Sequence, residues 1–226
     1  MAEEALRIIA RIRTDFPEKF GIPRQSGRVA GLQAAIVFEP EFRDLNALRG
    51  LEQYSHLWLI WQFSANLKAG WSPTVRPPRL GGNQRLGVFA TRSPFRPNPL
   101  GLSAVRLLGV EMSREEGPLL RVSGADLMDG TPIYDIKPYL QSDCVPDARD
   151  GFSSAHSQDY LPVEIPPQWL EKVPTDKQEA LRGILREDPR PAYQEEGRRY
   201  GFFFAGLEIF FVVEQGVLQV VEIKNA

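Results

Sequence analysis

The stretch YSHLWLIWQF, residues 54–63, decides the fold class of this 226-residue chain. It is a nearly continuous run of aromatic and aliphatic residues, too short to cross a membrane and typical of a strand buried on both faces. Shorter strand candidates, separated by Pro and Gly, lie on both sides of it at residues 5–13, 28–38, 86–91, 102–110 and 119–123. This pattern predicts a mainly β chain whose residues 5–140 form an antiparallel barrel or sandwich.

A second, smaller unit is predicted at the C-terminus. Residues 141–167 are polar and rich in Ser, Asp and Pro, which indicates a linker or a long surface loop. Residues 168–226 then predict a small α+β domain, with a helix capped by Thr175 and ended by Pro189.

Two strands, 198–213 and 217–223, are predicted to flank a hairpin turn at 214–216. The first of them, YGFFFAGLEIFFVV, holds more apolar surface than a unit of this size can bury alone. We therefore expect the unit to pack against the barrel or a second subunit.

Composition excludes several classes of protein. The formal net charge is −2, and the single cysteine, Cys144, excludes an intrachain disulfide and a cysteine-rich zinc site. Only His56 and His156 are available as imidazole ligands, so no metal site is expected. No run is long enough for a membrane span, and the acidic N-terminus has no signal pattern, which indicates a cytoplasmic protein.

The charges are distributed unevenly along the chain. Residues 53–110 contain no Asp or Glu but hold seven basic residues, which are Lys68, Arg76, Arg79, Arg85, Arg92, Arg96 and Arg106. Such a region suggests an anionic ligand such as a phosphate, a nucleotide or a nucleic acid. The alternative is a solvated basic loop whose acidic partners lie elsewhere in the fold.

One motif within this region points to a ligand site. Three prolines stiffen RSPFRPNPLG, residues 92–101, so that Arg92 and its polar neighbours are presented on a rigid loop. Arginines held this way suit a carboxylate or a ribose, although they could also pair with surface acids. The glycine patterns of Rossmann and P-loop nucleotide sites are absent from the sequence.

Three carboxylates follow within ten residues, at Asp126, Asp129 and Asp135. They could hold ribose hydroxyls, ligate a divalent cation or cap turns. The segment GIPRQ, residues 21–25, adds a short proline-stiffened loop with a donor-rich side chain.

Taken together, these segments resemble a known family. The segments that carry the resemblance, in order and spacing, are GIPRQ (21–25), GLEQYSHLWLIWQF (50–63), GWSPTVRPPRLGGN (70–83), GVFATRSPFRPNPLGLS (87–103), DLMDGTPIYDIKPYL (126–140) and DPRPAY (188–193). They strongly resemble the TrmO family, also called TsaA-like or YaeB-like tRNA methyltransferases, over about four fifths of the chain.

The resemblance implies a single-sheet β-barrel enzyme that acts as a homodimer and uses S-adenosyl-L-methionine. The implied reaction methylates N6 of threonylcarbamoyladenosine (t6A) at position 37, next to the anticodon of a threonine-accepting tRNA, and gives m6t6A. The cofactor contacts implied at matching positions are Pro23, Arg24, Gln25, Phe63, Ser64, Arg92, Leu102, Asp129, Gly130, Thr131 and Pro132. The family often has histidine where this chain has Ser64.

Further roles are assigned from chemistry. A carboxylate or tyrosine near the reacting nitrogen would accept its proton, and the candidates are Asp126, Asp135 and Tyr139. Basic side chains are expected to hold tRNA phosphates, at Lys68, Arg76, Arg79 and Arg85. In the C-terminal unit, Arg190 and Tyr193 are the expected RNA contacts. The unit is expected to orient the RNA and not to bind the cofactor, so a chain ending near residue 167 is expected to keep cofactor binding but lose tRNA methylation.

Two other functions stay open at this point. A non-catalytic RNA-binding barrel would use the same basic stretch and aromatic residues, but it would not need the Arg92 loop together with the Asp129 turn. A metal-dependent hydrolase built on the aspartates is the weaker alternative.

Overall fold

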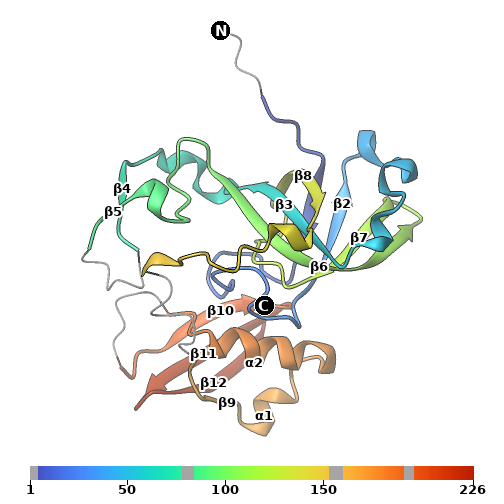
Figure 1. Cartoon of the computed structure of the whole chain (residues 1–226). Helices are drawn as coiled ribbons and strands as arrows, with labels where there is room; N and C mark the ends of the chain where they lie inside the picture. Colours follow the sequence, from blue (N-terminus) through green and yellow to red (C-terminus); the bar gives the residue numbers. More distant parts are fainter. Residues whose placement is uncertain (1–4, 78–83, 153–159, 191–195) are drawn as a thin grey trace.

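The computed structural model describes residues 5–77, 84–152, 160–190 and 196–226. Figure 1 shows two units, a barrel and below it a smaller α+β unit, with the connection between β1 and β2 lying between them. The prediction of a mainly β chain is confirmed.

Six strands form the barrel. In chain order they are β1 (Ala10–Arg13), β2 (Gln33–Phe38), β3 (His56–Gln62), β6 (Leu100–Ser113), β7 (Gly117–Ser123) and β8 (Pro132–Pro138). They close in the order β1-β2-β7-β6-β3-β8. The short strand β1 completes the ring, because it pairs antiparallel with β2 on one side and with β8 on the other.

The central strand β3 is buried on one face only. Leu57, Leu59 and Trp61 point into the barrel core, while the residues between them are partly exposed. The prediction of burial on both faces is wrong, because a barrel strand alternates between the interior and the outside. Strand β8 was not predicted, since a turn motif directly precedes its first residue, Pro132.

The connection from β3 to β6, residues 64–99, projects from the barrel; we call it the lobe. It contains η4 (Ser64–Ala69), β4 (Thr74–Val75), β5 (Leu86–Gly87) and η6 (Val88–Ala90), with β4 and β5 paired. The predicted strand at 86–91 is therefore only two residues long. Other short 3-10 turns lie at η1 (Pro40–Phe42), η2 (Leu45–Leu48), η3 (Leu51–Gln53) and η7 (Gln141–Asp143).

The C-terminal unit is a four-stranded sheet covered by a helix. Its elements are β9 (Val163–Glu164), α1 (Pro167–Leu170), η9 (Thr175–Lys177), α2 (Gln178–Arg186), β10 (Tyr200–Phe204), β11 (Leu207–Glu214) and β12 (Val217–Asn225). The sheet order is β10-β11-β12-β9, and β9 pairs parallel with β12.

Local chemistry explains how this unit differs from the expectation. The predicted strand 198–213 is broken at Ala205 and Gly206, whose φ angles are 52° and 74°, so it forms a hairpin of its own. The predicted turn before β12 is confirmed, with left-handed φ at Gln215 and Gly216. Thr175 does not cap α2, because the chain passes through η9 first and Lys177 precedes the helix without a side-chain cap.

The barrel and the C-terminal unit have separate hydrophobic cores, and the β1–β2 connection belongs to the core of the C-terminal unit. Phe16, Val29 and Leu32, from the β1–β2 connection at residues 14–32, are buried together with α2 and the inner face of the C-terminal sheet. The rings of Phe16 and Phe204 lie 5.3 Å apart between centroids. The expected packing of the C-terminal unit against the barrel is thus made through this connection. No helix among the described residues has the length and apolar character to cross a membrane.

Candidate active site

A cleft of about 630 Å³ opens at one end of the barrel. Its walls come from the β1–β2 connection, the adjoining ends of β3 and β6, the lobe, and the segment before β8. This volume suits a ligand the size of a nucleoside derivative. Eight predicted cofactor residues line it: Pro23, Arg24, Gln25, Phe63, Ser64, Arg92, Leu102 and Thr131.

The loop that carries Pro23, Arg24 and Gln25 rests on the C-terminal unit. Gly21 begins this loop with φ +95°, and a Cβ added there would lie 2.4 Å from the Phe202 ring. Further along, Arg24 Nη2 donates to the Asp188 carbonyl oxygen at 3.4 Å. The C-terminal unit therefore supports the cofactor-facing loop directly.

The barrel wall of the cleft is built by close packing at the end of β3. The Phe63 ring packs edge-on against Trp61, with 4.4 Å between centroids. Trp61 in turn lies flat over Gly101, where an added Cβ would lie 2.3 Å from the indole. Glycine at position 101 is thus what lets the indole approach β6.

The Arg92 loop is stiff for an additional reason. The guanidinium of Arg96 donates through Nη1 to the carbonyl oxygens of Val88, at 3.0 Å, and Thr91, at 2.7 Å. These bonds close the loop on itself and leave Arg92 exposed at the cleft. A fixed, exposed guanidinium can form charge-assisted bonds to a ligand carboxylate.

Asp126 is the acidic side chain that lines the cleft. Its Oδ1 accepts a hydrogen bond from Ser103 Oγ at 2.6 Å, and Ser103 Oγ accepts one from Trp61 Nε1 at 2.9 Å. Burial raises the pKa of the Asp126 carboxyl, while the bonds from Ser103 and Ser26 and the charge of Arg92 lower it in part. A carboxylate held in this way is suited to accept a proton.

The other two proton-transfer candidates lie outside the cleft. Asp135 forms an ion pair with Lys137 at 2.8 Å on the partly exposed side of β8. Tyr139 packs on Trp58, with 5.0 Å between ring centroids. Only Asp135 lies on β8, and its outward position was not predicted because β8 itself was not.

Three of the predicted cofactor contacts, Asp129, Gly130 and Pro132, are likewise absent from the cleft lining. Asp129 Oδ1 accepts the backbone N–H of Thr14 at 2.9 Å, and the Gly130 carbonyl accepts Arg11 Nη1. The Asp129 turn thus anchors the end of β1, while its neighbour Thr131 reaches the cleft.

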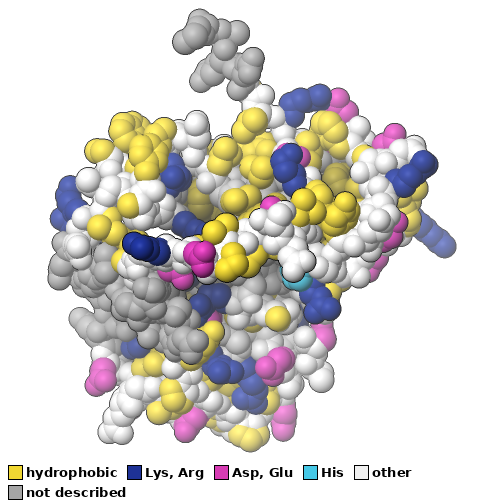
Figure 2. Space-filling model, in the orientation of Figure 1, with side chains coloured by type: hydrophobic (Ala, Val, Ile, Leu, Met, Phe, Trp, Pro, Cys, Tyr) yellow, Lys and Arg dark blue, Asp and Glu magenta, His cyan; other side chains and the backbone are white. Residues whose placement is uncertain are grey.

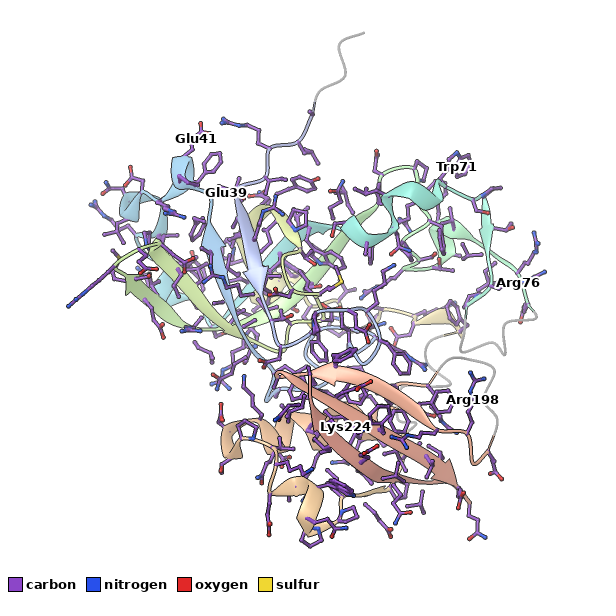
Figure 3. All side chains as sticks on the ribbon, turned by 180° about the vertical axis from the view of Figure 1, so that it is seen from behind. Glu39, Glu41, Trp71, Arg76, Arg198 and Lys224 are labelled. Carbon is purple, nitrogen blue, oxygen red and sulfur yellow. The ribbon has the colours of Figure 1, made fainter. Side chains whose placement is uncertain are left out.

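The predicted RNA contacts divide into three groups. Arg76 and Arg85 are exposed on the lobe, and Figure 3 shows Arg76 at its outer edge. Arg190 is 8% exposed and pairs with Asp188 at 2.7 Å, so its guanidinium is not presented on the surface. The side chain of Lys68, and all of Arg79 and Tyr193, lie outside the described residues.

Several cleft residues escaped sequence reasoning. They include Lys19, Ser26, Asn66, Thr91 and Met128. Ser26 directly follows GIPRQ and was within reach of that motif, and its Oγ accepts the Ala104 N–H at 3.1 Å. Trp58 and Trp61, which the sequence offered only as aromatic residues of the basic stretch, also line the cleft. Within the described residues, no group of three or more His, Cys, Asp or Glu side chains is placed to hold a metal.

Comparison with known proteins agrees with this architecture. The profile of the tRNA-methyltransferase O N-terminal domain matches residues 11–144, and that of the TrmO C-terminal domain matches residues 159–226. The tRNA (adenine(37)-N6)-methyltransferase of Escherichia coli K12 is 40% identical over 223 residues, covering 89% of this chain and 94% of the relative.

A sequence and a crystal structure from Pseudomonas aeruginosa are also similar to this chain. RcsF, named as a proposed S-adenosylmethionine-dependent methyltransferase, is 43% identical over 215 residues, covering 89% of each chain. The crystal structure of TrmO from that organism superposes with a TM-score of 0.81 at 34% identity, covering 99% of each chain. The two domain profiles span most of the sequence and the similarity extends over nearly its full length, so the chain belongs to the tRNA-methyltransferase O family.

Proposed function

We propose that this chain transfers a methyl group from S-adenosyl-L-methionine to N6 of t6A at position 37 of a threonine-accepting tRNA, giving m6t6A. Family membership and the names of the relatives support the broader activity, an S-adenosylmethionine-dependent tRNA (adenine-N6)-methyltransferase. The observation that carries the proposal is that Arg92 and Asp126 both line one cleft, which lies beside the basic lobe.

The cleft residues fit the cofactor chemically. A guanidinium suits the amino acid carboxylate, and Arg92 is the exposed cleft arginine on the stiffened loop. Backbone groups around Phe63 and Leu102 suit an adenine edge, and the hydroxyl and amide groups of Ser64 and Gln25 suit a ribose. When bound, the cofactor supplies a methyl group already activated by its sulfonium.

Asp126 is the group we propose to move the proton. N6 of t6A carries a hydrogen that must leave as the nitrogen gains the methyl group. The Asp126 carboxylate accepts it, because burial raises the pKa of this carboxyl towards that of an effective base. Ser103 and Trp61 fix the orientation of the carboxylate through their hydrogen bonds.

The surface that contacts tRNA is proposed from the positions of the basic side chains. Arg76 and Arg85, with Lys68 and Arg79, are proposed to hold the phosphates near the anticodon. Figure 3 shows Arg198 of the C-terminal unit on the same side of the molecule as Arg76, so both units can contact one RNA. We further propose that the protein works as a homodimer in the cytoplasm, where its substrate is made.

Nucleoside mass spectrometry tests the reaction. Purified protein is incubated with methyl-labelled cofactor and with tRNA from cells that lack this protein, and the digested nucleosides are analysed. The expected product is labelled m6t6A, with no label in t6A-free tRNA. The Asp126→Asn variant serves as the matched control and should yield little product. Label on another nucleoside, or none at all, would contradict the proposed reaction.

A further inference from the structure

The lobe carries large aromatic side chains that are exposed to solvent. Trp71 is 57% exposed and Phe89 is 74% exposed, and Phe95 lies at the border of exposure. Figure 3 shows Trp71 at the top of the lobe and Arg76 at its right-hand edge. In Figure 2 hydrophobic and basic side chains gather over this lobe. We call Trp71, Phe89 and Phe95 the aromatic platform.

Backbone bonds hold the three aromatic residues in one place. The Ser72 N–H donates to the Phe95 carbonyl at 3.1 Å, which ties the residue after Trp71 to Phe95. The Val88 N–H donates to the Pro73 carbonyl at 3.0 Å, which brings the residue before Phe89 to the same place. The platform is therefore a fixed surface assembled from three segments of the lobe.

The stretch of sequence that carries the platform holds basic residues and no acidic residues. Residues 53–110 contain no acid, and the guanidinium of Arg96 lies over the Phe89 ring, 5.6 Å from its centroid. Exposed aromatic rings interleaved with arginines are the usual surface for unpaired nucleic acid, because bases stack on the rings while phosphates meet the cations.

The platform also adjoins the cleft. The segment that links Phe89 to Phe95 contributes Thr91, Arg92 and Pro94 to the cleft lining. Bases next to one held in the cleft would therefore lie close to the platform.

We infer that the aromatic platform stacks unpaired bases of the RNA, next to the base held in the cleft. This inference rests on the proposed tRNA substrate and adds the residues that read the single-stranded loop. Trp71 and Phe89 provide the stacking faces, and Arg76 and Arg85 hold the adjoining phosphates. Charge favours RNA over a second copy of the chain, because the segment that carries the platform, residues 53–110, holds seven basic residues and no acid.

The test compares variants that differ in the ring alone. Trp71→Leu and Phe89→Leu keep an apolar side chain but remove the stacking face, whereas Trp71→Phe keeps a ring. Met112→Ala is the matched control, since Met112 is exposed on β6 at the end away from the cleft. The probe is an anticodon stem-loop RNA with 2-aminopurine at unpaired positions, and the readouts are RNA affinity, probe fluorescence and its dependence on salt.

Each leucine variant should weaken RNA binding roughly 5- to 100-fold and abolish the fluorescence change of the stacked base. Trp71→Phe should retain most of the binding, and Met112→Ala all of it. The slope of affinity against salt should stay at the wild-type value in the ring variants but fall by about one in Arg76→Ala. Cofactor affinity, measured by calorimetry, should be unchanged throughout.

Three results would overturn the inference. Wild-type RNA binding by Trp71→Leu and Phe89→Leu would exclude stacking. A change in oligomeric state that accompanies the loss of binding would make the platform a contact between two copies. Lowered cofactor affinity would assign the rings to the cleft instead. The proposed function is tested separately, since it fails only if wild-type protein does not methylate t6A.

Discussion

Arg28 and Glu187 form an ion pair that joins the β1–β2 connection to the end of α2. The Glu187 side chain is 5% exposed and that of Arg28 is 18% exposed, so the pair is largely shielded from water. Because the connection also carries the cofactor-facing loop, the pair links the cleft to the C-terminal unit. The energetics of this link and of the cleft can be tested residue by residue.

Removal of the Glu187 carboxylate should destabilise the whole chain. Glu187→Ala leaves a shielded guanidinium opposite an apolar group, which costs about 3–5 kcal/mol. Glu222→Ala is the control, because Glu222 pairs with Arg199 at the surface, where solvent screening leaves an ion pair little effect on stability. Denaturant unfolding of both variants measures the difference, and equal losses would show that the Arg28–Glu187 pair is no more important than a surface pair.

Asp126→Asn should lower the methylation activity without destabilising the protein. Loss of the proton acceptor should lower the methylation rate about 100-fold or more. Burial raises the pKa of Asp126 in the folded state, so the stability it provides is present at low pH and lost as pH rises through that pKa. The Asn variant should therefore match the wild type at acidic pH and be more stable at pH 8.

Thermal unfolding from pH 4 to pH 8 checks this sign. Wild-type activity should also rise with pH as the Asp126 carboxyl loses its proton. A variant that is less stable than the wild type at pH 8 would show that the carboxylate is needed for folding.

Arg92→Ala should weaken cofactor binding. A charge-assisted contact contributes about 1.5–3 kcal/mol, which corresponds to an increase in Kd of roughly 10- to 150-fold. Arg106→Ala is the control, because Arg106 is exposed on the same barrel but does not line the cleft. Calorimetric titration with the cofactor measures both, and an unchanged Kd for Arg92→Ala would remove the assigned role.

Gly21→Ala should destabilise the protein through the cofactor-facing loop. The new Cβ would meet the Phe202 ring at 2.4 Å, and φ is +95° at this position. Together these effects cost about 2–4 kcal/mol. Gly87→Ala is the control, since φ there is ordinary and no atom lies within 4 Å of an added Cβ. A comparable melting temperature for the two variants would contradict the proposed support of the loop by β10.

A chain ending near residue 167 should lose cofactor binding. The sequence suggested the opposite, since the C-terminal unit appeared dispensable for the cleft. In the structure Phe16, Val29 and Leu32 are buried by that unit, and Gly21 rests on Phe202. Truncation would expose these apolar residues and release the loop that lines the cleft. Wild-type cofactor affinity in the shortened chain would refute this prediction.

The sequence predicted elements well where the signal was local. The apolar run around β3 and the turn at Gln215 and Gly216 depend on neighbouring residues alone. Strand β8 was missed because its residues follow a turn motif and its pairing partners, β1 and β3, are distant in sequence.

For the candidate site too, residues with a local signal could be predicted, and residues whose position depends on distant packing could not. Segments of contiguous sequence, such as Pro23–Arg24–Gln25, contain residues that line the cleft, while their role as cofactor contacts stays a prediction. The burial of Arg190 depends on the packing of the α2 end, which no local pattern reveals. The choice of Asp126 over Asp135 likewise depends on which side of the barrel wall each carboxylate occupies.

The core of the C-terminal unit also sets when the cofactor-facing loop is completed during synthesis on the ribosome. Phe16, Val29 and Leu32 emerge early, but the residues that bury them, such as Phe202 and Phe204 on β10, are made about 170 to 190 residues later. At roughly 5–20 residues per second, these side chains wait exposed for about ten seconds or more. Synthesis of β10 is therefore required before the cofactor-facing loop can be buried, and a chain stalled before it keeps these apolar side chains exposed.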